Sequence, residues 1–587
     1  RLPVNVKNTV QTASVLGREF EMRVLKNMYP DDHDIGSKIR TAEDEKVWYS
    51  GEEGKMIFTH ALLRKAVYDM QMKSVVNDLH LLAAETIKKL SGKKVSHHNS
   101  EQISYHLGLG HNIVNNKNKV LVTKEKLKDE KFRKYAEEYL GYQISIADKY
   151  RTDYRNEKAL ELYDLILALL DKLNDKEQSY NVLLKKVEIL NNVSRWDDAG
   201  KEVEKAMLIA KGMKDSKMTM IAKQQQAEVY FYKSDFDKSE RLLKLVLQYF
   251  IRNRVNPEII ETIYALGYLN YTRGKYNQAW DFFKKYANIR NKYKNNLFKV
   301  NFYTAFGAIL TKKGDSKKAI SYLNKSLIIS QKDNYRKQIA VSYRFLGNNY
   351  FAMGLIKKSL SSYFTSQKIF EEIGDRSQLG ITLGNIGNIH FVTQNSDLAN
   401  IYYNKQLNIF KSINKLSGIA TSYGSLGRIF ASKGDYKRAL EYYRKQYHIN
   451  RLLKIEDSIS TSFGNIGKLY FDIGKYKKSI NYFTKQYKIS LSISKKDEIL
   501  SSLLNLGGAN TLINNYKEAI KFYDKALSLI KNNVMNLDAF NLYLNYCELL
   551  IKLKQYKKAF IYCNKVISLK KHCSDVDLIL IAKIIFQ

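Results

Sequence analysis

Apolar residues along most of this chain recur every three or four positions, in blocks separated by short polar turns. That spacing predicts amphipathic helices rather than strands. Only three prolines occur, Pro3, Pro30 and Pro257, so hard helix breaks are few and no proline-rich linker is present. A chain of 587 residues is too long for one compact core. The pattern therefore predicts an all-α protein with several domains or one long array.

The helical blocks repeat with a period of 40 residues. The small residue of the Leu266-Gly267 pair serves as an anchor, and it recurs without one insertion or deletion. Its eleven positions are Ala147, Val187, Ala227, Gly267, Gly307, Gly347, Gly387, Gly427, Gly467, Gly507 and Cys547. Self-similarity at a fixed period is the mark of a repeat architecture.

Three further positions keep the same register. Seven residues after the anchor come Gly274, Gly314, Gly354, Gly434, Gly474 and Asn514, which suit a turn with a left-handed backbone. Twelve residues after it come only Ala or Ser, at Ala159, Ala199, Ser239, Ala279, Ala319, Ser359, Ala399, Ala439, Ser479, Ala519 and Ala559. Aromatic residues follow at Phe283, Tyr363, Tyr403, Tyr443, Phe483 and Tyr523, where we expect them to fill the groove between units. Each unit is predicted to be helix, tight turn and helix, stacked into one continuous core.

These units resemble the tetratricopeptide repeat family, whose L-G…Y…G-x-Y-x-x-A pattern appears at Ser425–Gln446 and Asn465–Gln486. The 40-residue period is longer than the usual 34 and resembles a subclass with extended helices. We expect a tetratricopeptide-type α-solenoid over residues 132–587: eleven units to about Ser568 and a truncated twelfth. Because the chain starts at Arg1 and stops in an apolar run, Asp577–Phe586, we interpret it as a fragment.

The first part of the chain does not follow the repeat. Residues Leu2–Met28 predict two short helices split at Gly17. Two short runs, 47–50 and 56–59, flank a glycine-bearing turn and predict a two-stranded wing, and helices follow from Ala61 and over Asn77–Leu90. We expect a small winged-helix-like domain at residues 1–75 and a helical connector at residues 76–131.

This block resembles the segment after the ATPase module of large bacterial signalling ATPases, through Leu2–Glu21, Phe58–Gln71 and Leu79–Ile87. Many such proteins carry an adenylate or guanylate cyclase, or a protein kinase, before the ATPase. The resemblance implies that ATP or ADP with Mg²⁺ binds in a module upstream of Arg1. The chain itself has no G-x-x-x-x-G-K-[ST] phosphate loop, so we assign it no cofactor and no catalytic residue.

Histidines are the remaining candidates for chemistry. The resemblance places His60 at the start of the helix after the wing, where related ATPases use a histidine to contact the diphosphate of ADP. A structural histidine at a helix start is the alternative. We interpret His80 and His106 as packing residues, and His97 with His98 is too isolated for a metal site.

The charge and the cysteines bear on the kind of partner and on the cellular compartment. The net charge is +38, but lysines are spread along the array, so either compositional bias or an acidic partner explains it. Cys547, Cys563 and Cys573 form no C-x-x-C pair, and the first two fall on core positions, where we expect unpaired apolar fillers. This pattern and the absence of an 18-residue apolar run predict a cytoplasmic protein that does not span a membrane.

In this repeat class the first helix of each unit lines the concave surface. Exposed polar residues beside the anchors are therefore the predicted partner-binding set: Arg344, Asn348, Asn385, Asn388, Arg428, Asn465, Lys468, Asn505 and Asn545. Asparagine offers a donor and an acceptor to an extended backbone, and Arg or Lys binds a carboxylate. Arg344, Asn348 and Asn385 resemble part of the carboxylate clamp of chaperone-binding repeats, although Thr421 and Ser425 break that pattern in the next repeat.

The leading hypothesis is a sensor region that binds a protein or acidic peptide in the groove and regulates an upstream ATPase and cyclase. The alternative is a stand-alone scaffold or co-chaperone without a switch. A transcription regulator would need the segment Ser37–Lys46 to read DNA, but its charges are mixed, so we expect no nucleic-acid partner.

Overall fold

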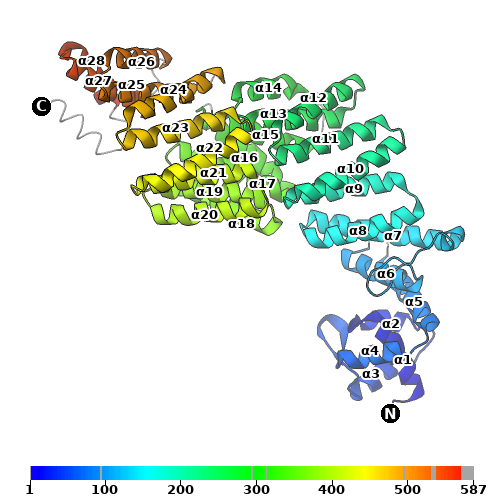
Figure 1. The fold of residues 1–587 in the computed structure, drawn as a ribbon. Helices are drawn as coiled ribbons and strands as arrows, with labels where there is room; N and C mark the ends of the chain where they lie inside the picture. The colour runs from blue at the N-terminus through cyan, green and yellow to red at the C-terminus, as the bar shows by residue number, and fades with distance from the viewer. Residues whose placement is uncertain are drawn as a thin grey trace. The chain divides into compact units, whose positions relative to one another are not determined.

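The structure is a computed structural model, and it describes residues 2–92, 95–291, 295–312, 314–493, 496–530 and 537–569. The chain divides into two compact units (Figure 1). Unit 1 comprises Arg1–Asn191 and Asp197–Ala222, and unit 2 comprises Asn192–Trp196 and Lys223–Gln587. Each unit is described by itself below.

The N-terminal part of unit 1 is a small mixed domain. Its elements are α1 (Val4–Leu16), β1 (Glu19–Glu21), α2 (Met22–Asn27), α3 (Ile35–Asp44), β2 (Trp48–Ser50), β3 (Lys55–Phe58) and α4 (Ala61–Asp69). Strands β2 and β3 pair antiparallel, as the predicted wing does, with Trp48 opposite Phe58. The structure adds a third strand, because β1 pairs with β3 and completes a sheet of order β1-β3-β2. Residues 2–28 are thus two helices separated by a strand as well as by Gly17.

The connector consists of two packed helices, α5 (Lys73–Ser91) and α6 (His97–Gly110). His80 on α5 and His106 on α6 are 0% and 2% exposed. Their Nδ1 atoms lie 2.7 Å apart, and Nε2 of His80 is 2.9 Å from the hydroxyl of Tyr68. Both histidines therefore pack in the interior, as predicted, and they also form a polar chain. Burial lowers the pKa of His80 to about 4 and that of His106 to about 3.

All eleven predicted repeats are present as helix pairs (Figure 1). The first helices are α7 (Glu130–Thr152), α9 (Lys176–Asn192), α11 (Ser216–Tyr232), α13 (Asn256–Thr272), α15 (Asn296–Lys312), α17 (Arg336–Ala352), α19 (Arg376–Val392), α21 (Leu416–Ser432), α23 (Glu456–Asp472), α25 (Lys496–Leu512) and α27 (Leu537–Lys552). The second helices are α8 (Asn156–Leu173), α10 (Trp196–Gly212), α12 (Phe236–Arg252), α14 (Tyr276–Asn291), α16 (Ser316–Lys332), α18 (Ile356–Ile373), α20 (Ser396–Ser412), α22 (Tyr436–Leu452), α24 (Tyr476–Ser492), α26 (Tyr516–Leu529) and α28 (Tyr556–Leu569). The predicted twelfth unit lies outside the described residues.

The turn between the two helices of a repeat has the left-handed backbone that the sequence predicts. Glycine adopts it at five of these turns, for example Gly434 with φ of 78°. The other turns reach positive φ without glycine, as at Ser234 (67°) and Gln394 (60°). The repeat geometry therefore imposes the conformation even where the residue type does not favour it.

The anchor glycines make room for the recurring aromatic residues. A Cβ atom on Gly347 would lie 2.5 Å from the Tyr363 ring, and one on Gly427 would lie 2.5 Å from Tyr443. Each ring thus rests on the glycine of its own repeat. This finding corrects the expectation that the aromatic residues fill only the groove between units. It also explains why a residue that destabilises helices by about 1 kcal/mol recurs there.

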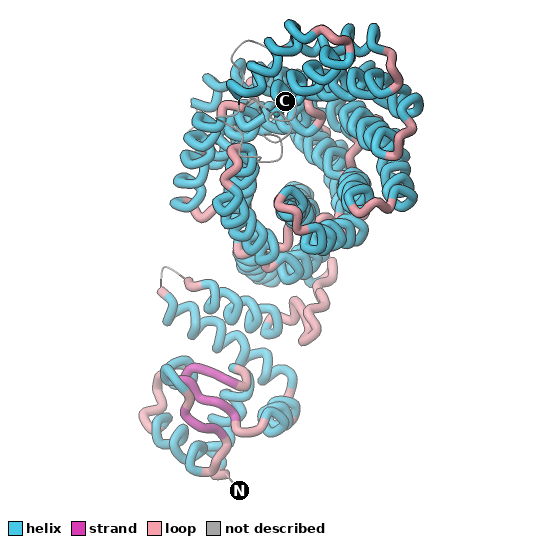
Figure 2. The backbone as a smooth tube through the Cα atoms, turned by 90° about the vertical axis from the view of Figure 1, so that its left-hand side faces the viewer, coloured by secondary structure: helices cyan, strands magenta, loops and turns pink. Residues whose placement is uncertain are grey.

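Curvature defines an inner face of unit 2. First helices of successive repeats pack against one another, for example α15 with α17 and α19 with α21, and successive second helices show no comparable packing among the described residues. The first helices therefore lie on the inside of the curve, as expected, and the repeats of unit 2 curve into a ring (Figure 2). We call the exposed side of these first helices the inner face.

Unit 2 also contacts itself across distant repeats. The hydroxyl groups of Ser234 and Ser417 lie 2.8 Å apart although 183 residues separate them, and Nζ of Lys337 donates to Oδ1 of Asn192 across 2.7 Å, 145 residues away. Ser234 and Ser417 belong to repeats that are five units apart. Repeats that are five units apart in the sequence are therefore in direct contact within unit 2.

The cysteine prediction was partly wrong. Cys547 is fully buried in the core formed by α25 to α28, as expected for an apolar filler. It is not unpaired, because it forms a disulfide with Cys563 on α28, with Cα atoms 6.2 Å apart. Cys547 occupies the anchor position of its repeat. Cys563 occupies the position of the aromatic residue that rests on the anchor in repeats such as that of Gly347 and Tyr363, so the two cysteines face each other. Cys573 lies outside the described residues.

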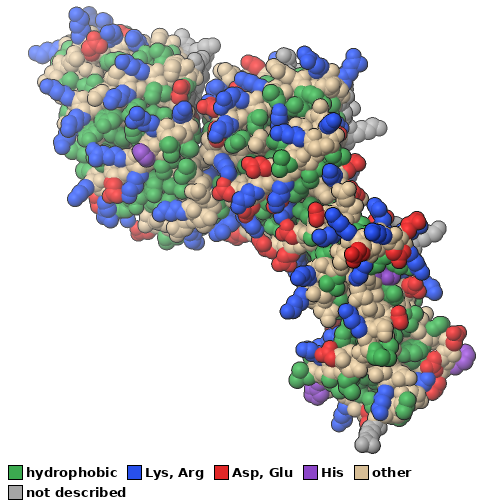
Figure 3. Space-filling view, turned by 45° about the vertical axis from the view of Figure 1, so that its right-hand side comes forward, with side chains coloured by type: hydrophobic (Ala, Val, Ile, Leu, Met, Phe, Trp, Pro, Cys, Tyr) green, Lys and Arg blue, Asp and Glu red, His purple; other side chains and the backbone are tan. Residues whose placement is uncertain are grey.

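Charged side chains are dispersed over the face of the molecule that Figure 3 draws. On the face drawn in Figure 3, Lys and Arg side chains are scattered over each unit, with acidic and apolar side chains between them. No helix in the described part of the chain is long and apolar enough to cross a membrane. The same residues contain no group of three His, Cys, Asp or Glu side chains that could hold a metal ion.

Candidate binding face

A recurring hydrogen-bonded bridge organises the inner face, and Asn348 shows its form. This residue follows the anchor Gly347 on α17. Its Oδ1 accepts from the hydroxyl of Tyr363 on α18 at 2.7 Å and from Nδ2 of Asn385 on α19 at 2.9 Å. One amide oxygen therefore links both helices of its own repeat to the first helix of the next repeat.

The next repeat contains the same bridge. Oδ1 of Asn388 accepts from the hydroxyl of Tyr403 at 2.8 Å and from Nη2 of Arg428 at 2.7 Å. Arg428 also stacks over the Phe391 ring, with Cζ 5.0 Å from its centre. Four of the predicted partner-binding residues are thus joined in two bridges: Asn348 with Asn385, and Asn388 with Arg428.

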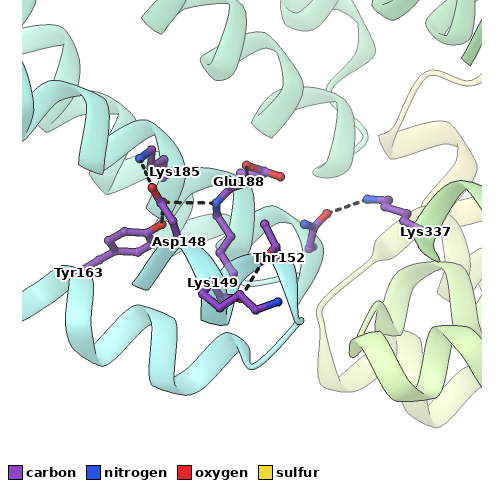
Figure 4. Close-up of polar contacts among 9 residues, drawn as sticks. Asp148, Lys149, Thr152, Tyr163, Lys185, Glu188 and Lys337 are labelled. Atoms are coloured by element: carbon purple, nitrogen blue, oxygen red, sulfur yellow. Dashed lines mark hydrogen bonds and ion pairs between the residues drawn. The ribbon is translucent and has the colours of Figure 1, made fainter. Parts of the chain in front are cut away.

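An acidic version of the bridge occurs in unit 1. Asp148, one residue after the anchor Ala147, accepts from the Tyr163 hydroxyl at 2.6 Å and from Nζ of Lys185 at 2.7 Å (Figure 4). Nη1 of Arg151 donates to Oε2 of Glu188 in the next repeat at 2.8 Å. The same register position therefore supplies the acceptor in both units, and carboxylates replace the amides in unit 1.

The bridges in unit 2 fix the orientation of the asparagine amides. In each bridge both donors bind the amide oxygen Oδ1 of the asparagine. The Nδ2 groups of Asn348 and Asn388 form no hydrogen bond with another described residue. Asn385 uses its Nδ2 group for the bridge, so its Oδ1 is a free acceptor within the described chain. All three side chains are partly buried rather than fully exposed. The inner face thus presents two amide donors and one amide acceptor in fixed directions.

The remaining predicted residues lie on the expected helices but outside these bridges. Nδ2 of Asn465 donates to Gln446 at 3.2 Å, and Lys468 pairs with Asp472 at 3.7 Å. Asn505 and Asn545 are partly buried on α25 and α27. Arg344 is near Asn348 in sequence, but it forms no hydrogen bond with Asn348 or Asn385. The predicted clamp-like trio is therefore reduced to the two asparagines.

Sequence reasoning missed a second recurring pair. Gly384, Gly424 and Gly464, three residues before the anchors, contact Gln406, Gln446 and Gln486. A Cβ atom on Gly384 would lie 2.1 Å from Nε2 of Gln406, so the pair needs glycine. The 40-residue spacing of these glutamines is a visible signal in the sequence. Each glycine therefore lets a glutamine of the second helix pack directly against the first helix of the same repeat.

His60, the predicted nucleotide-sensing residue, lies immediately before α4. It has an extended backbone and an exposed side chain, and it makes no capping hydrogen bond to the helix. The structural alternative, a hydrogen-bonded helix-start histidine, has no support in this geometry. Its imidazole is accessible to a ligand.

Sequence comparison identifies the repeats in unit 2. One profile of the tetratricopeptide repeat matches residues 378–447 and 458–532, and a second matches residues 300–333 and 540–573. The all-α repeat region is thus a tetratricopeptide-type solenoid. A search of curated protein sequences found no match.

Several solved structures resemble this chain in part, at low sequence identity. A Rap protein complexed with Competence and Sporulation Factor is 14% identical with a TM-score of 0.47, covering 60% of this chain and 98% of that one. The Cut9–Hcn1 hetero-tetramer of APC/C is 12% identical with a TM-score of 0.48, covering 88% and 94%. A signal transduction ATPase with a tetratricopeptide repeat sensor from Pyrococcus horikoshii is 15% identical with a TM-score of 0.32, covering 89% and 62%. These likenesses carry no functional argument.

Proposed function

We propose that this chain, whose repeat region is a tetratricopeptide-type solenoid, binds an extended segment of a partner protein along the inner face of unit 2. The observation that carries the proposal is the pair of bridges at Asn348 and Asn388, which leave donors and an acceptor free. An extended backbone offers N–H and C=O groups alternately and can satisfy both kinds of partner.

The charge of this region favours an acidic segment. Arg428 is fixed beside Asn388, and Lys468 is exposed on the following first helix. The chain as a whole carries a net charge of +38, which adds long-range attraction for an acidic partner. Backbone hydrogen bonds would hold the segment, and these cations would select its charge.

Fluorescence anisotropy with rhodamine-labelled octaglutamate tests this proposal. Asn348→Ala combined with Asn388→Ala should weaken binding about tenfold, because two hydrogen bonds of about 0.5–1.5 kcal/mol each are lost. The matched control is Asn404→Ala with Asn408→Ala on α20, where both side chains are exposed on a second helix. The control should change affinity less than about twofold. Equal losses in both variants would reject the inner face as the binding surface.

We propose further that the chain is the sensor region of a signal-transduction ATPase. Two observations support this. The order α1-β1-α2-α3-β2-β3 is that of a winged-helix domain, and His60 is exposed at the start of the next helix. In this scheme a module upstream of Arg1 binds ATP or ADP with Mg²⁺, and His60 donates a hydrogen bond to the diphosphate. Partner binding would then bias that module and its cyclase output.

The coding sequence upstream of Arg1 tests the second proposal. It should encode a phosphate-loop motif and a cyclase or kinase domain, and the absence of both would contradict it. A stand-alone scaffold, the competing function, requires that residues 140–587 bind the partner as well as the longest protein does, with no effect of nucleotide. DNA reading by α3 is disfavoured because its Lys38 is paired with Asp32 at 2.5 Å.

A further inference from the structure

Turns of unit 2 contact the N-terminal ends of first helices that lie five repeats later. Ser234 lies in the turn between α11 and α12, and its hydroxyl oxygen is 2.8 Å from that of Ser417 on α21. One repeat further along, a Cβ atom on Gly274, in the turn between α13 and α14, would lie 3.1 Å from Oδ2 of Asp457 on α23. Both sides advance by one repeat between the two contacts, so the contacts belong to one continuous line.

The preceding turn makes the same kind of contact. The segment Asn192–Trp196, which joins α9 to α10, belongs to unit 2. Oδ1 of Asn192 accepts from Nζ of Lys337 on α17 at 2.7 Å, and the ring centre of Trp196 is 5.7 Å from Nζ of Lys415. Nζ of Lys415 also donates to Oγ of Ser377 on α19 at 2.6 Å. Burial is the main reason that the pKa of Lys415 falls to about 8, because a covered ammonium group is less stable in its charged form.

The burial of the turns follows this line of contact. The residue seven positions after the anchor is 6% exposed at Ser194 and 3% exposed at Ser234. The same position is exposed at Gly354, Gln394 and Gly434. All these repeats share the helix–turn–helix geometry, so that geometry does not produce the difference. Another part of the chain therefore covers the turns at Ser194 and Ser234.

We call this line of contact the seam. It consists of Asn192, Trp196, Ser234 and Gly274 on the side of the turns and of Lys337, Ser377, Lys415, Ser417 and Asp457 on the side of the first helices. The first helices α17, α19 and α21, whose N-terminal ends form the seam, also carry Asn348, Asn388 and Arg428 of the inner face. The seam therefore closes the gap through which a segment would otherwise reach these residues from the side of the ring.

We propose that the seam is closed in solution and that a partner segment reaches the inner face by its free end. This inference rests on the proposed binding of an extended segment and names the kind of segment that fits, a flexible terminal tail or a short free peptide. Neighbouring extended strands lie only about 5 Å apart, whereas a folded domain of about 100 residues has a radius of gyration of about 13 Å. A segment held between two such domains has no end that can enter the closed ring.

A disulfide between Ser234→Cys and Ser417→Cys tests whether the seam is closed. The two hydroxyl oxygens are 2.8 Å apart, so the cysteines should link on mild oxidation without denaturant. The control combines Ser234→Cys with Ser432→Cys, because Ser432 lies at the other end of α21, roughly 22 Å from Ser417. Mass spectrometry of proteolytic peptides should find the link to position 417 and none to position 432. Absence of the link to position 417 would overturn the closed seam.

Thiol labelling of single variants tests closure without a new bond. Ser234→Cys and Gln394→Cys change the same register position in two repeats, one buried and one exposed. A maleimide should label Gln394→Cys at least about tenfold faster than Ser234→Cys, because exchange of a covered site requires local opening. Equal labelling rates at the two positions would contradict the closed seam.

Two forms of octaglutamate test the route of entry: the free labelled peptide, and the same eight residues held between two folded domains. The linked chain is compared with the oxidised single variant Ser234→Cys, so that the disulfide between Cys547 and Cys563 is present in both. The free peptide should bind both within about twofold, and the enclosed segment should bind the linked chain at least about tenfold more weakly than the free peptide does. Equal binding of the two ligands to the linked chain would overturn entry by a free end, as would loss of free-peptide binding on linking.

A variant with an opened seam provides the converse test. Ser234→Glu with Ser417→Glu places two carboxylates together, and their repulsion should separate the two sides. The enclosed segment should then bind within about threefold of the free peptide; a difference that stays tenfold would show that the seam is not the barrier. Free octaglutamate that binds no form of the chain would contradict the inner-face proposal and entry by a free end together. Free octaglutamate that binds, with no effect of linking on the enclosed segment, would remove only the inference about the seam.

Discussion

The hydroxyl group of Tyr403 donates a hydrogen bond of 2.8 Å to Oδ1 of Asn388, fifteen residues earlier in the chain. Tyr403 rests on the anchor Gly387 of the same repeat, where a Cβ atom would be 2.7 Å from its ring. The glycine that lets the two helices approach therefore also positions the tyrosine that orients the asparagine. The same tyrosine therefore packs the two helices of the repeat together and sets the direction of the Asn388 amide.

Tyr403→Phe should separate these two effects. The ring remains, but Asn388 loses one of the two donors that hold its oxygen. We expect a loss of about 1 kcal/mol in stability and a two- to fivefold loss of octaglutamate affinity. Tyr443→Phe is the control, because Tyr443 occupies the same register and its hydroxyl bonds to no other described residue. Thermal melts and anisotropy that show equal changes in both variants would contradict the bridge.

Two adjacent glycines on α25 test whether the anchor position must lack a Cβ atom so that the aromatic ring can pack on it. A Cβ atom on Gly507 would lie 2.4 Å from the Tyr523 ring, whereas one on Gly508 would approach nothing closer than 3.8 Å. Gly507→Ala should therefore destabilise the C-terminal repeats by about 1–3 kcal/mol, while Gly508→Ala should stabilise them by roughly 0.5–1 kcal/mol. Chemical denaturation followed by circular dichroism measures both. A stabilising effect of Gly507→Ala would show that the close approach is unnecessary.

The buried histidine pair predicts acid sensitivity in the connector. The pKa of His80 falls to about 4 and that of His106 to about 3, from an ordinary value of 6.5, because burial disfavours the charged imidazole. In the unfolded chain both histidines bind protons as the pH falls below about 6.5, whereas in the folded state they do not. The stabilisation is complete above pH 6.5 and is lost as the pH falls toward the folded-state values.

Hydrogen exchange at pH 7 and pH 5 measures this effect. Peptides from α5 and α6 should exchange faster at pH 5, after correction for the intrinsic rate, than they do at pH 7. Peptides from α23 and α24 contain no histidine and are the internal control. Equal protection of α5 and α6 at both pH values would contradict the predicted loss.

The repeat and its register could be predicted from the sequence because the interactions that set them are local. The anchor, the small residue at Ala399 and the turn at Gln394 lie within twelve residues of one another, so the 40-residue period carries the signal. The strand β1 was missed because Glu19-Phe20-Glu21 is too short for an alternation pattern. It exists only because β3, more than thirty residues away, offers an edge.

The details of the binding face depend on partners in other repeats, which the sequence pattern does not reveal. The sequence predicts that Asn348 and Asn388 lie on first helices, and they do. The direction of each amide, however, depends on hydrogen bonds with Tyr363 and Asn385 in one bridge and with Tyr403 and Arg428 in the other. The sequence pattern did not reveal the disulfide between Cys547 and Cys563 either, because their pairing depends on two positions that face each other across two helices.

Photo-crosslinking tests the central claim most directly, because it reports where a peptide lies. An octaglutamate peptide with a benzophenone group at its centre would be crosslinked to the unchanged chain, and the adducts mapped by mass spectrometry. Binding on the inner face predicts adducts on the first helices α17, α19 and α21, and their loss when Asn348 and Asn388 are both changed to alanine. Adducts on the second helices α18, α20 and α22, or adducts that survive this double change, would contradict the account.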